Sequence, residues 1–383
     1  MGALDGITVL ALEHAVAAPF ATRQLADRGA RVIKIERPGS GDFARGYDSR
    51  ARGLSSHFVW TNRSKESLTL DLKHAKAPAI LDALLARADI VVQNLAPGAA
   101  ARLGLSWARL QADHPRLILC DISGYGPGSD RKAYDLLVQA EAGLLSVTGS
   151  ADSPAKAGIS VADIAAGMYA LTGLLSALIE RGRTGRGSHL EISMMGALAE
   201  WMGFPMYYAM DGQAPPARAG AAHPAIFPYG PFAAADGQVI LGLQNDREWR
   251  VFCADILRDP TLAQDPRFAT NDDRARHAPQ LRGIIETAFA ALTAAEIMAR
   301  LDAAGIGNAR LNDMAALWSH PALAAQWDEV DSPAGPLPAL RPPGQPAPRM
   351  DPIPQLGQHS RAILTELGLS REDIDRLAEE GAI

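Results

Sequence analysis

Short apolar segments alternate with amphipathic ones along the first third of the chain. Pro19–Arg28 and Pro78–Ala88 have the period of amphipathic helices, and the first has proline near its start and Gly29 just past its end, as helix ends prefer. Short strands that alternate with helices are typical of a parallel, doubly wound α/β sheet. Four short and mainly apolar segments predict strands of this sheet: Ile7–Leu12, Ala30–Glu36, Asp89–Asn94 and Arg116–Gly126.

The rest of the chain divides into a helical middle, a smaller unit and a C-terminal tail. Tyr134–Leu145 and Asp163–Glu180 predict helices, and the glycine-rich turn Arg181–His189 leads into a further strand. In the smaller unit Gln238–Gln244 predicts a strand. Helices are predicted there and in the tail over Asp246–Leu257, Pro279–Leu292, Ala294–Ala304 behind a Thr293 cap, Ser360–Leu367, and a last segment capped by Ser370.

Two stretches rich in proline, Met206–Pro231 and Pro333–Pro354, interrupt this pattern and predict connections between domains. We therefore expect a Rossmann-like large domain with a parallel sheet, formed by residues 1–205 and 325–383. A smaller α+β domain is expected over 225–315, with connecting segments at 206–224 and 316–354.

Composition excludes several classes of protein. The net charge of −6 gives no basic footprint for nucleic acid. Cys120 and Cys253 cannot form a thiol-rich metal site, and the nine histidines contain no HExxH pair, so we expect no metal. Low cysteine usage fits a reducing cytoplasm. The longest uncharged run, Ile164–Ile179, is shorter than the roughly twenty residues of a membrane span, so a buried helix is expected.

A βαβ start invites a dinucleotide hypothesis, but the residues do not favour it. The first turn reads EHAVAAPFA and lacks the glycines that let backbone approach a pyrophosphate. Without them, Glu36 is more simply a charge at a strand end. The glycine-rich turn Arg181–His189 lies between helix and strand, the reverse of the Rossmann order. P-loop and GxSxG motifs are absent from the sequence.

Asp163 is the last charge before the long apolar helix, and it has two interpretations. The simpler one is a helix cap, because carboxylates are common at helix N-termini. The functional one is a carboxylate nucleophile, which must be ionised, partly desolvated and rigidly held. A helix start beneath an apolar face can supply all three conditions.

Several segments together resemble the family III CoA-transferases, the group of formyl-CoA transferase and carnitine CoA-transferase, with which the α-methylacyl-CoA racemases share a fold. The resemblance covers nearly the whole chain, and the order and spacing of the segments make it specific. The segments are Leu25–Asp42, Asn62–Lys73, Ala88–Leu105, DISGYGPGS, the stretch ADIAAGMYALTGLLSALIERGRTGRG that begins with Ala162, and the terminal GQHSRAILTELGLS.

The resemblance implies that Asp163 is the catalytic aspartate. It would attack an acyl-CoA thioester to give a mixed anhydride and then an aspartyl-CoA thioester, from which an acceptor carboxylate takes CoA. Coenzyme A enters as a thioester substrate, with no tightly bound cofactor, and an interlocked homodimer is implied. The resemblance assigns CoA contacts to His14, Ala18, Arg37, Lys73, Asn94, Arg102, Lys132 and Met194.

A racemase is the principal alternative, and one position separates it from a transferase. The racemases resemble this chain at Asp163 but use a His–Asp pair for proton exchange. Here Tyr134 stands where that histidine would be, followed by Asp135, and tyrosine is a poor base at neutral pH. This favours a transferase, with Tyr134 and Asp135 as substrate contacts. A non-catalytic CoA-binding protein would be expected to lack Asp163.

The substrate interpretation depends on loops. Formyl-CoA transferases resemble one another in a glycine-rich loop, and the corresponding residues here are GLQNDREW, Gly242–Trp249, which weighs against oxalate as acceptor. This form looks more like members that act on C4–C5 dicarboxylic acids, including those that move CoA within one molecule of mesaconyl-CoA. Arg45, with Arg50 and Arg52, either binds a distal carboxylate or forms a solvated basic loop.

Overall fold

The computed structural model describes residues 2–383, which form two compact units. The large unit contains residues up to Ala142, then Ala157–Gly203 and Ala325–Ile383. The small unit contains Gly143–Lys156 and Phe204–Ala324. The stretch Gly143–Lys156, which we expected in the large domain, therefore groups with the small unit.

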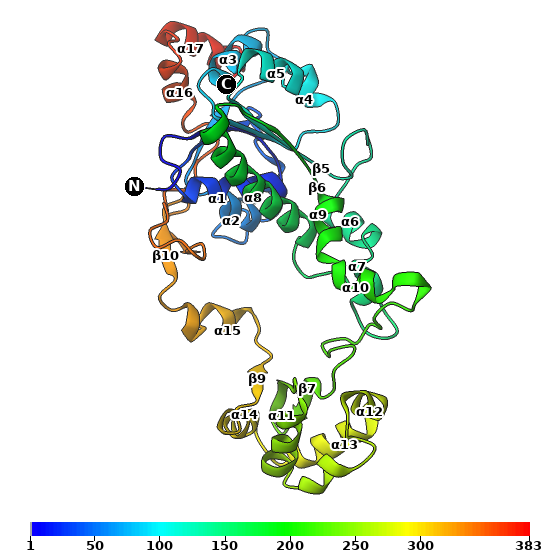
Figure 1. The fold of residues 1–383 in the computed structure, drawn as a ribbon. Helices are drawn as coiled ribbons and strands as arrows, with labels where there is room; N and C mark the ends of the chain where they lie inside the picture. Colours follow the sequence, from blue (N-terminus) through cyan, green and yellow to red (C-terminus); the bar gives the residue numbers. More distant parts are fainter. Residues whose placement is uncertain (1) are drawn as a thin grey trace. The chain divides into compact units, whose positions relative to one another are not determined.

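A six-stranded sheet of parallel strands forms the centre of the large unit, which confirms the predicted α/β class (Figure 1). The strand order is β3-β2-β1-β4-β5-β6, the order of a doubly wound fold. Val9 of β1 pairs with Val32 on one side and Ile90 on the other. The strands are β1 (Thr8–Leu12), β2 (Arg31–Glu36), β3 (Lys65–Thr69), β4 (Ile90–Gln93), β5 (Ile118–Ser123) and β6 (His189–Ser193).

Strand β3 is the one member of this sheet that the apolar pattern missed. Its sequence is KESLT, and Lys65 and Glu66 give it a polar start. Lys65 is nevertheless buried, because it pairs with a buried carboxylate described below. A paired lysine in a strand interior cannot be told from a surface lysine by periodicity alone.

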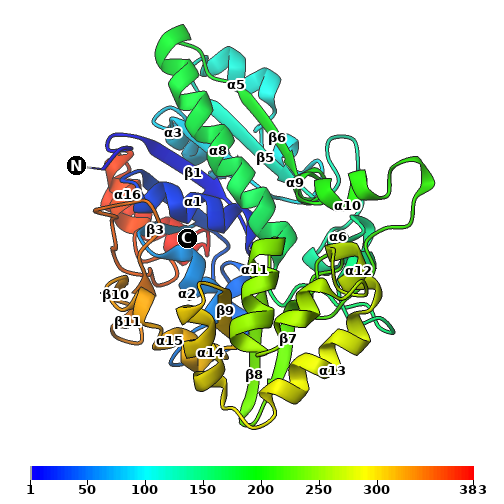
Figure 2. The same cartoon turned by 60° about the horizontal axis from the view of Figure 1, so that its bottom comes forward.

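Helices cover both faces of the sheet (Figure 1, Figure 2). Side chains alternate along β1, so Val9 and Ala11 pack with α1 and α8, while Leu10 and Leu12 pack with α3, α5, α16 and α17. The helices of the large unit are α1 (Ala17–Asp27), α2 (Ser56–Asn62), α3 (Ala77–Leu85), α4 (Ala99–Arg102), α5 (Trp107–Asp113), α6 (Asp135–Glu141), α8 (Val161–Thr184), α9 (Met194–Trp201), α16 (Ser360–Glu366) and α17 (Arg371–Glu379), with a 3-10 turn η1 (Phe43–Gly46).

Helix α8 is long and apolar enough to cross a membrane by composition, but its buried residues belong to the core that α1 shares. It ends at Gly185, whose φ of 72° is the left-handed conformation common after helices. The predicted helix Tyr134–Leu145 is interrupted, because α6 ends before Gly143, also left-handed, and α7 follows.

The C-terminal tail returns to the first strands of the sheet. After the hairpin β10 (Trp327–Val330) and β11 (Leu337–Leu340), Arg349 donates hydrogen bonds to the carbonyls of Gly29, Ala30 and Ser64. The His359 N–H then binds the carbonyl of Ser67 in β3, and the Asp71 N–H binds that of Ala382. The tail therefore covers the outer edge of the sheet. Ser370 caps α17 as predicted.

The small unit is a three-stranded antiparallel sheet, β7-β8-β9, packed with helices around its own aromatic core. The Thr293 cap is confirmed, as part of a capping box with Glu296. Strand β7 lies partly within the stretch Met206–Pro231 that we expected to be a connection. The elements are β7 (Tyr229–Ala234), β8 (Gly237–Gly242), β9 (Gly307–Arg310), α7 (Leu144–Val147), α10 (Gly203–Tyr208), α11 (Asp246–Val251), α12 (Asn271–Arg276), α13 (Ala278–Phe289), α14 (Ala294–Ala303) and α15 (Met314–Trp318), with short turns η2 (Met210–Gly212), η3 (Phe252–Ile256), η4 (Pro260–Gln264) and η5 (Pro321–Leu323).

Candidate active site

A cavity of about 670 Å³ opens at the carboxyl ends of β1, β4 and β5 in the large unit. Strand order reverses between β1 and β4, and doubly wound sheets bind ligands at such a point. The volume is in the range of small-molecule and cofactor sites. The walls are formed by the turn His14–Ala17, by Gln93–Ala96, by Asp121–Gly124 and by Asp163 at the start of α8.

Asp163 is half-buried in the first turn of α8 and faces this cavity. Burial raises the pKa of its carboxyl to about 7, and the negative charge of Asp135 acts in the same direction. A hydrogen bond from the Ala17 N–H opposes both effects by favouring the ionised form. The group therefore ionises near neutral pH while remaining partly desolvated.

The interpretation of Asp163 as the cap of α8 is wrong. Ser160 occupies the cap position, and its side chain makes no capping hydrogen bond. Asp135 does this instead, since its Oδ1 accepts the Ala162 N–H at 2.9 Å. Gln139 holds the other oxygen of Asp135 at 2.7 Å. Asp163 is thus left with its carboxylate directed to the N-terminus of α1.

A glycine brings the two helices together. A Cβ atom at Gly167 would lie 2.7 Å from the Ala17 carbonyl oxygen and 2.9 Å from Phe20, so no side chain fits there. Gly167 lies one turn after Asp163 in α8. The close approach of α1 and α8 at this glycine places Asp163 against the Ala17 N–H.

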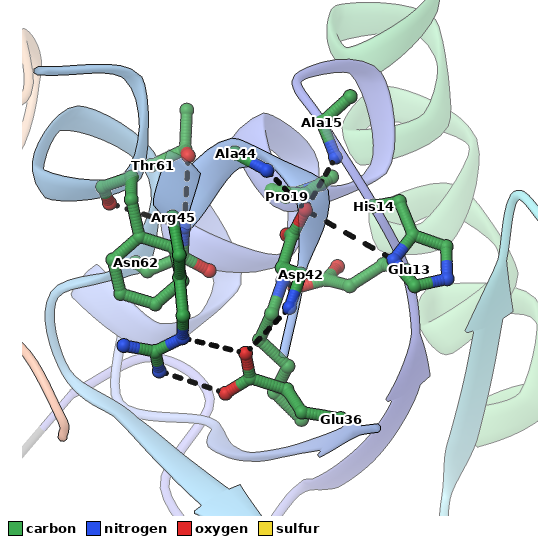
Figure 3. Close-up of polar contacts among 12 residues, drawn as sticks. Glu13, His14, Ala15, Pro19, Glu36, Asp42, Ala44, Arg45, Thr61 and Asn62 are labelled. Carbon is green, nitrogen blue, oxygen red and sulfur yellow. Dashed lines mark hydrogen bonds and ion pairs between the residues drawn. The ribbon is translucent and has the colours of Figure 1, made fainter. Parts of the chain in front are cut away.

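The turn between β1 and α1 has an unusual backbone. Ala15 has a φ of 64°, in the left-handed region that residues with a Cβ rarely adopt. The Asn94 side chain binds His14 on both sides, accepting its N–H at 2.8 Å and donating to its carbonyl at 2.9 Å. Asp42 Oδ1 accepts the Ala15 N–H at 3.0 Å (Figure 3). The conformation is thus held by side chains from two other loops.

Several residues assigned by resemblance lie together in this cavity. The imidazole of His14 packs 4.8 Å from the ring of Phe43, and burial lowers the pKa of His14. Asn94 lines the cavity as well, although its amide is occupied by the His14 backbone. Other assigned residues in the lining are Lys132, Tyr134, Asp135 and Met194.

Other assigned residues do not line the cavity. Ala18 is fully buried in the core, and Ala17, one residue earlier, lines the cavity in its place. Arg45 makes a bidentate ion pair with Glu36, with both N···O distances 2.8 Å, and its guanidinium lies over Phe58. Its charge is thus already paired, which removes the basis for expecting it at a substrate carboxylate. Exposed cations that lie outside the lining are Arg37, Lys73 and Arg102.

The wall formed by Tyr47 and His57 was missed in the sequence. Burial raises the pKa of Tyr47, and the negative charges of Asp42 and Asp163 add to the effect, so its hydroxyl lies near the carboxylates. No motif marks either residue. Only their place in the chain could have indicated them: Tyr47 and His57 follow the carboxyl end of β2, and loops at such strand ends form the ligand crevice of doubly wound sheets.

Comparison with known proteins agrees with this geometry. The family model for CoA-transferase family III matches residues 4–360. The chain belongs to this family. A CoA-transferase of this family has two cosubstrates, an acyl-CoA and a carboxylic acid.

The similarity extends over whole chains. A succinate–glutarate CoA-transferase of Agrobacterium fabrum is 34% identical, with 98% of this chain and 97% of the relative covered. An acetyl-CoA:oxalate CoA-transferase of Acetobacter aceti is 37% identical, with 85% of each covered. The crystal structure of a CAIB/BAIF family protein from Brucella suis has a TM-score of 0.83 at 32% identity, covering 96% of this chain and 99% of the other.

Proposed function

We propose that this CoA-transferase moves CoA from an acyl-CoA donor to a C4–C5 dicarboxylic acid, with Asp163 as the nucleophile. The observation that carries the proposal is the place of Asp163 in the cavity. Its carboxylate is partly desolvated, has a pKa of about 7 and is oriented by a backbone N–H at the start of α1. These are the conditions that a carboxylate nucleophile requires.

The reaction would proceed by exchange at acyl groups. An Asp163 oxygen adds to the thioester carbonyl, the C–S bond breaks, and a mixed anhydride and CoA thiolate result. The thiolate attacks the Asp163 carbonyl carbon, releasing the donor carboxylate and leaving an aspartyl-CoA thioester. The acceptor carboxylate repeats these steps in reverse order and leaves as the new CoA ester. The Ala17 N–H is placed to stabilise negative charge that develops on the Asp163 carboxyl.

The substrate class rests on the relatives. The acids in their names include succinate with glutarate, D-citramalate and mesaconate, which supports a C4–C5 acid. The oxalate enzyme of Acetobacter aceti is as similar, so Gly242–Trp249 does not separate oxalate from these acids. Lys132 is an exposed cation of the lining and is proposed to bind a phosphate or a carboxylate.

The remaining assignments stay proposals. Arg37, Lys73 and Arg102 are proposed to meet the outer part of CoA, because they follow β2, β3 and β4 at the edge where the cavity opens. The interlocked homodimer is supported by exposed aromatic residues of the small unit such as Tyr207 and Trp318. A cytoplasmic location rests on cysteine usage alone.

Peptide mass spectrometry after incubation with succinyl-CoA tests the mechanism. A hydroxylamine-labile CoA adduct on the peptide that contains Asp163 is expected. The Asp163→Asn variant should form none, while Asp130→Asn, an exposed acid in the loop beside the cavity, should form as much as wild type. If no adduct forms with a panel of acyl-CoAs, but the substrate α-carbon exchanges with deuterated water, the racemase alternative replaces this proposal.

A further inference from the structure

Lys34 is buried inside the large unit, in the middle of β2, and has no exposed side-chain surface. Its ammonium donates to Asp42 Oδ2 at 2.7 Å and to Glu13 Oε1 at 3.3 Å. Burial alone would lower its pKa, but the charges of Glu13 and Asp42 outweigh this and the pKa of Lys34 is raised. The two buried carboxylates therefore favour the charged form of Lys34.

Each of those carboxylates also binds a segment next to Asp163: Asp42 binds the turn before α1, and Glu13 binds α1 itself. One oxygen of Asp42 accepts the Ala15 N–H at 3.0 Å and the Ala44 N–H at 2.9 Å (Figure 3). The other oxygen accepts a hydrogen bond from Lys34. Its Oδ1 is also 3.9 Å from His14 Nδ1. Asp42 thus joins the buried lysine directly to the turn with left-handed Ala15.

Glu13 joins the same lysine to helix α1. Its Oε2 accepts the Thr22 hydroxyl at 2.6 Å, and its Oε1 accepts Lys65 at 2.6 Å. Lys65 in turn donates to the Pro19 carbonyl in the first turn of α1, at 3.1 Å. The first turn of α1 also carries Ala17, whose N–H binds Asp163.

The cluster contains two lysines and two carboxylates, namely Lys34, Lys65, Glu13 and Asp42, and all four are buried. Burial lowers the pKa of Lys65 to about 7, and the charge of Glu13 opposes this shift. A buried ion network costs desolvation, and apolar residues of similar size are often as stable. Such a network therefore needs a reason other than stability. Its outer contacts include the N–H of Ala15 and the carbonyl of Pro19, on either side of Ala17.

We propose that Lys34, acting through Asp42, is a positioning residue of the transfer reaction: it fixes the His14–Ala15 turn and with it the Ala17 N–H that orients Asp163. This inference rests on the proposed function, since it assigns a support to the nucleophile proposed there. Displacement of a reacting group by about 1 Å can cost roughly 100-fold in rate, so a support of this kind affects chemistry more than binding.

The test compares two buried aspartates. Asp42→Asn weakens the Lys34 contact and keeps an oxygen for Ala15. Asp27→Asn is the matched control, because Asp27 is equally buried and paired with Arg23 and Arg63 at the far end of α1. We expect Asp42→Asn to lower kcat and the rate of adduct formation roughly 10- to 100-fold, with the Kd for acyl-CoA within about 3-fold. Asp27→Asn should lose similar stability but keep kcat within about 2-fold.

A second variant, in which one positive and one negative charge are removed together, tests the proposal if Asp42→Asn does not fold. Lys34→Met with Asp42→Asn removes one cation and one anion, leaves Glu13 paired with Lys65, and keeps a side-chain oxygen that can accept the Ala15 and Ala44 N–H groups. Such replacement is often neutral for stability, so this variant should fold and still lose kcat. Equal kcat in wild type and this double variant overturns the inference, as does an equal loss in the Asp27→Asn control. If wild type itself forms no adduct on Asp163, the proposed function fails first, which is a distinct outcome.

Discussion

Asp135 binds the first turn of α8, the helix that carries Asp163, and its negative charge helps to raise the pKa of Asp163. One oxygen of Asp135 accepts the N–H of Ala162, the residue before Asp163, at 2.9 Å. The two carboxylates thus meet at the N-terminus of α8, where free N–H groups and the helix dipole favour negative charge. Burial of Asp163 and repulsion by Asp135 exceed that benefit, so Asp163 holds its proton up to about pH 7.

Asp135→Asn should lower the pKa of Asp163 toward the usual range, because one source of repulsion is removed while an oxygen remains to bind Ala162. The pH at which kcat/KM is half-maximal should therefore fall by about half a unit or more. A pH–rate series of both enzymes measures this. An unchanged midpoint would show that burial alone sets the pKa.

In wild type, kcat/KM should fall as the pH drops below about 7. Only the ionised form of Asp163 can attack a thioester, and kcat/KM follows ionisation of the free enzyme. The value should lose about 10-fold per pH unit well below the pKa. The carboxyl groups of the acceptor acids ionise below pH 6, so a flat profile between pH 6 and 8 would contradict the role of Asp163.

Asp163→Asn should stabilise the fold above pH 7 and not at pH 4. The folded-state pKa of about 7 lies above the unfolded value of 3.8, so ionisation destabilises the native state as the pH rises through this interval. We expect a gain of about 2 kcal/mol at pH 8, less than the full pKa difference implies because the side chain is half-buried. Urea denaturation at pH 4 and pH 8 measures it, and a gain of equal size at both would have another cause.

Gly167→Ala should separate α1 from α8. The new methyl group would lie 2.7 Å from the Ala17 carbonyl, so we expect a loss of about 1–3 kcal/mol together with most of the activity. Gly182, in the same helix, has open space around its Cα. Gly182→Ala should therefore gain about 1 kcal/mol from helix propensity and keep full activity.

Apolar periodicity predicted most of the large-unit sheet, because its strands are buried on both faces. In that sheet it missed β3, whose Lys65 is buried by pairing with Glu13. Elsewhere it missed β7, which lies in a stretch rich in Pro and Gly, and the short strands β9, β10 and β11. A buried charge is visible in a sequence only when its partner is known, and the partner here is 52 residues away.

The residues of the candidate site also differ in how well the sequence alone indicates their surroundings. Asp163 is marked in the sequence as the last charge before a long apolar helix. The contacts assigned by resemblance depend instead on aligning each residue correctly with the family. Ala18, assigned as a CoA contact, is fully buried, and its neighbour Ala17 lines the cavity. Arg45 carries a charge that Glu36 already neutralises, which only the fold reveals.

The return of the tail to β3 has a consequence for biosynthesis. The apolar face of Leu68 and Ile80 is completed by Ile363 and Leu377, which leave the ribosome only after all of residues 204–324 have been made. At typical elongation rates the interval between the synthesis of Ile80 and that of Ile363 is on the order of tens of seconds. During it the nascent chain presents an uncovered sheet edge and an open apolar face, so chaperones that bind such surfaces are expected to act on this enzyme before its last helices emerge.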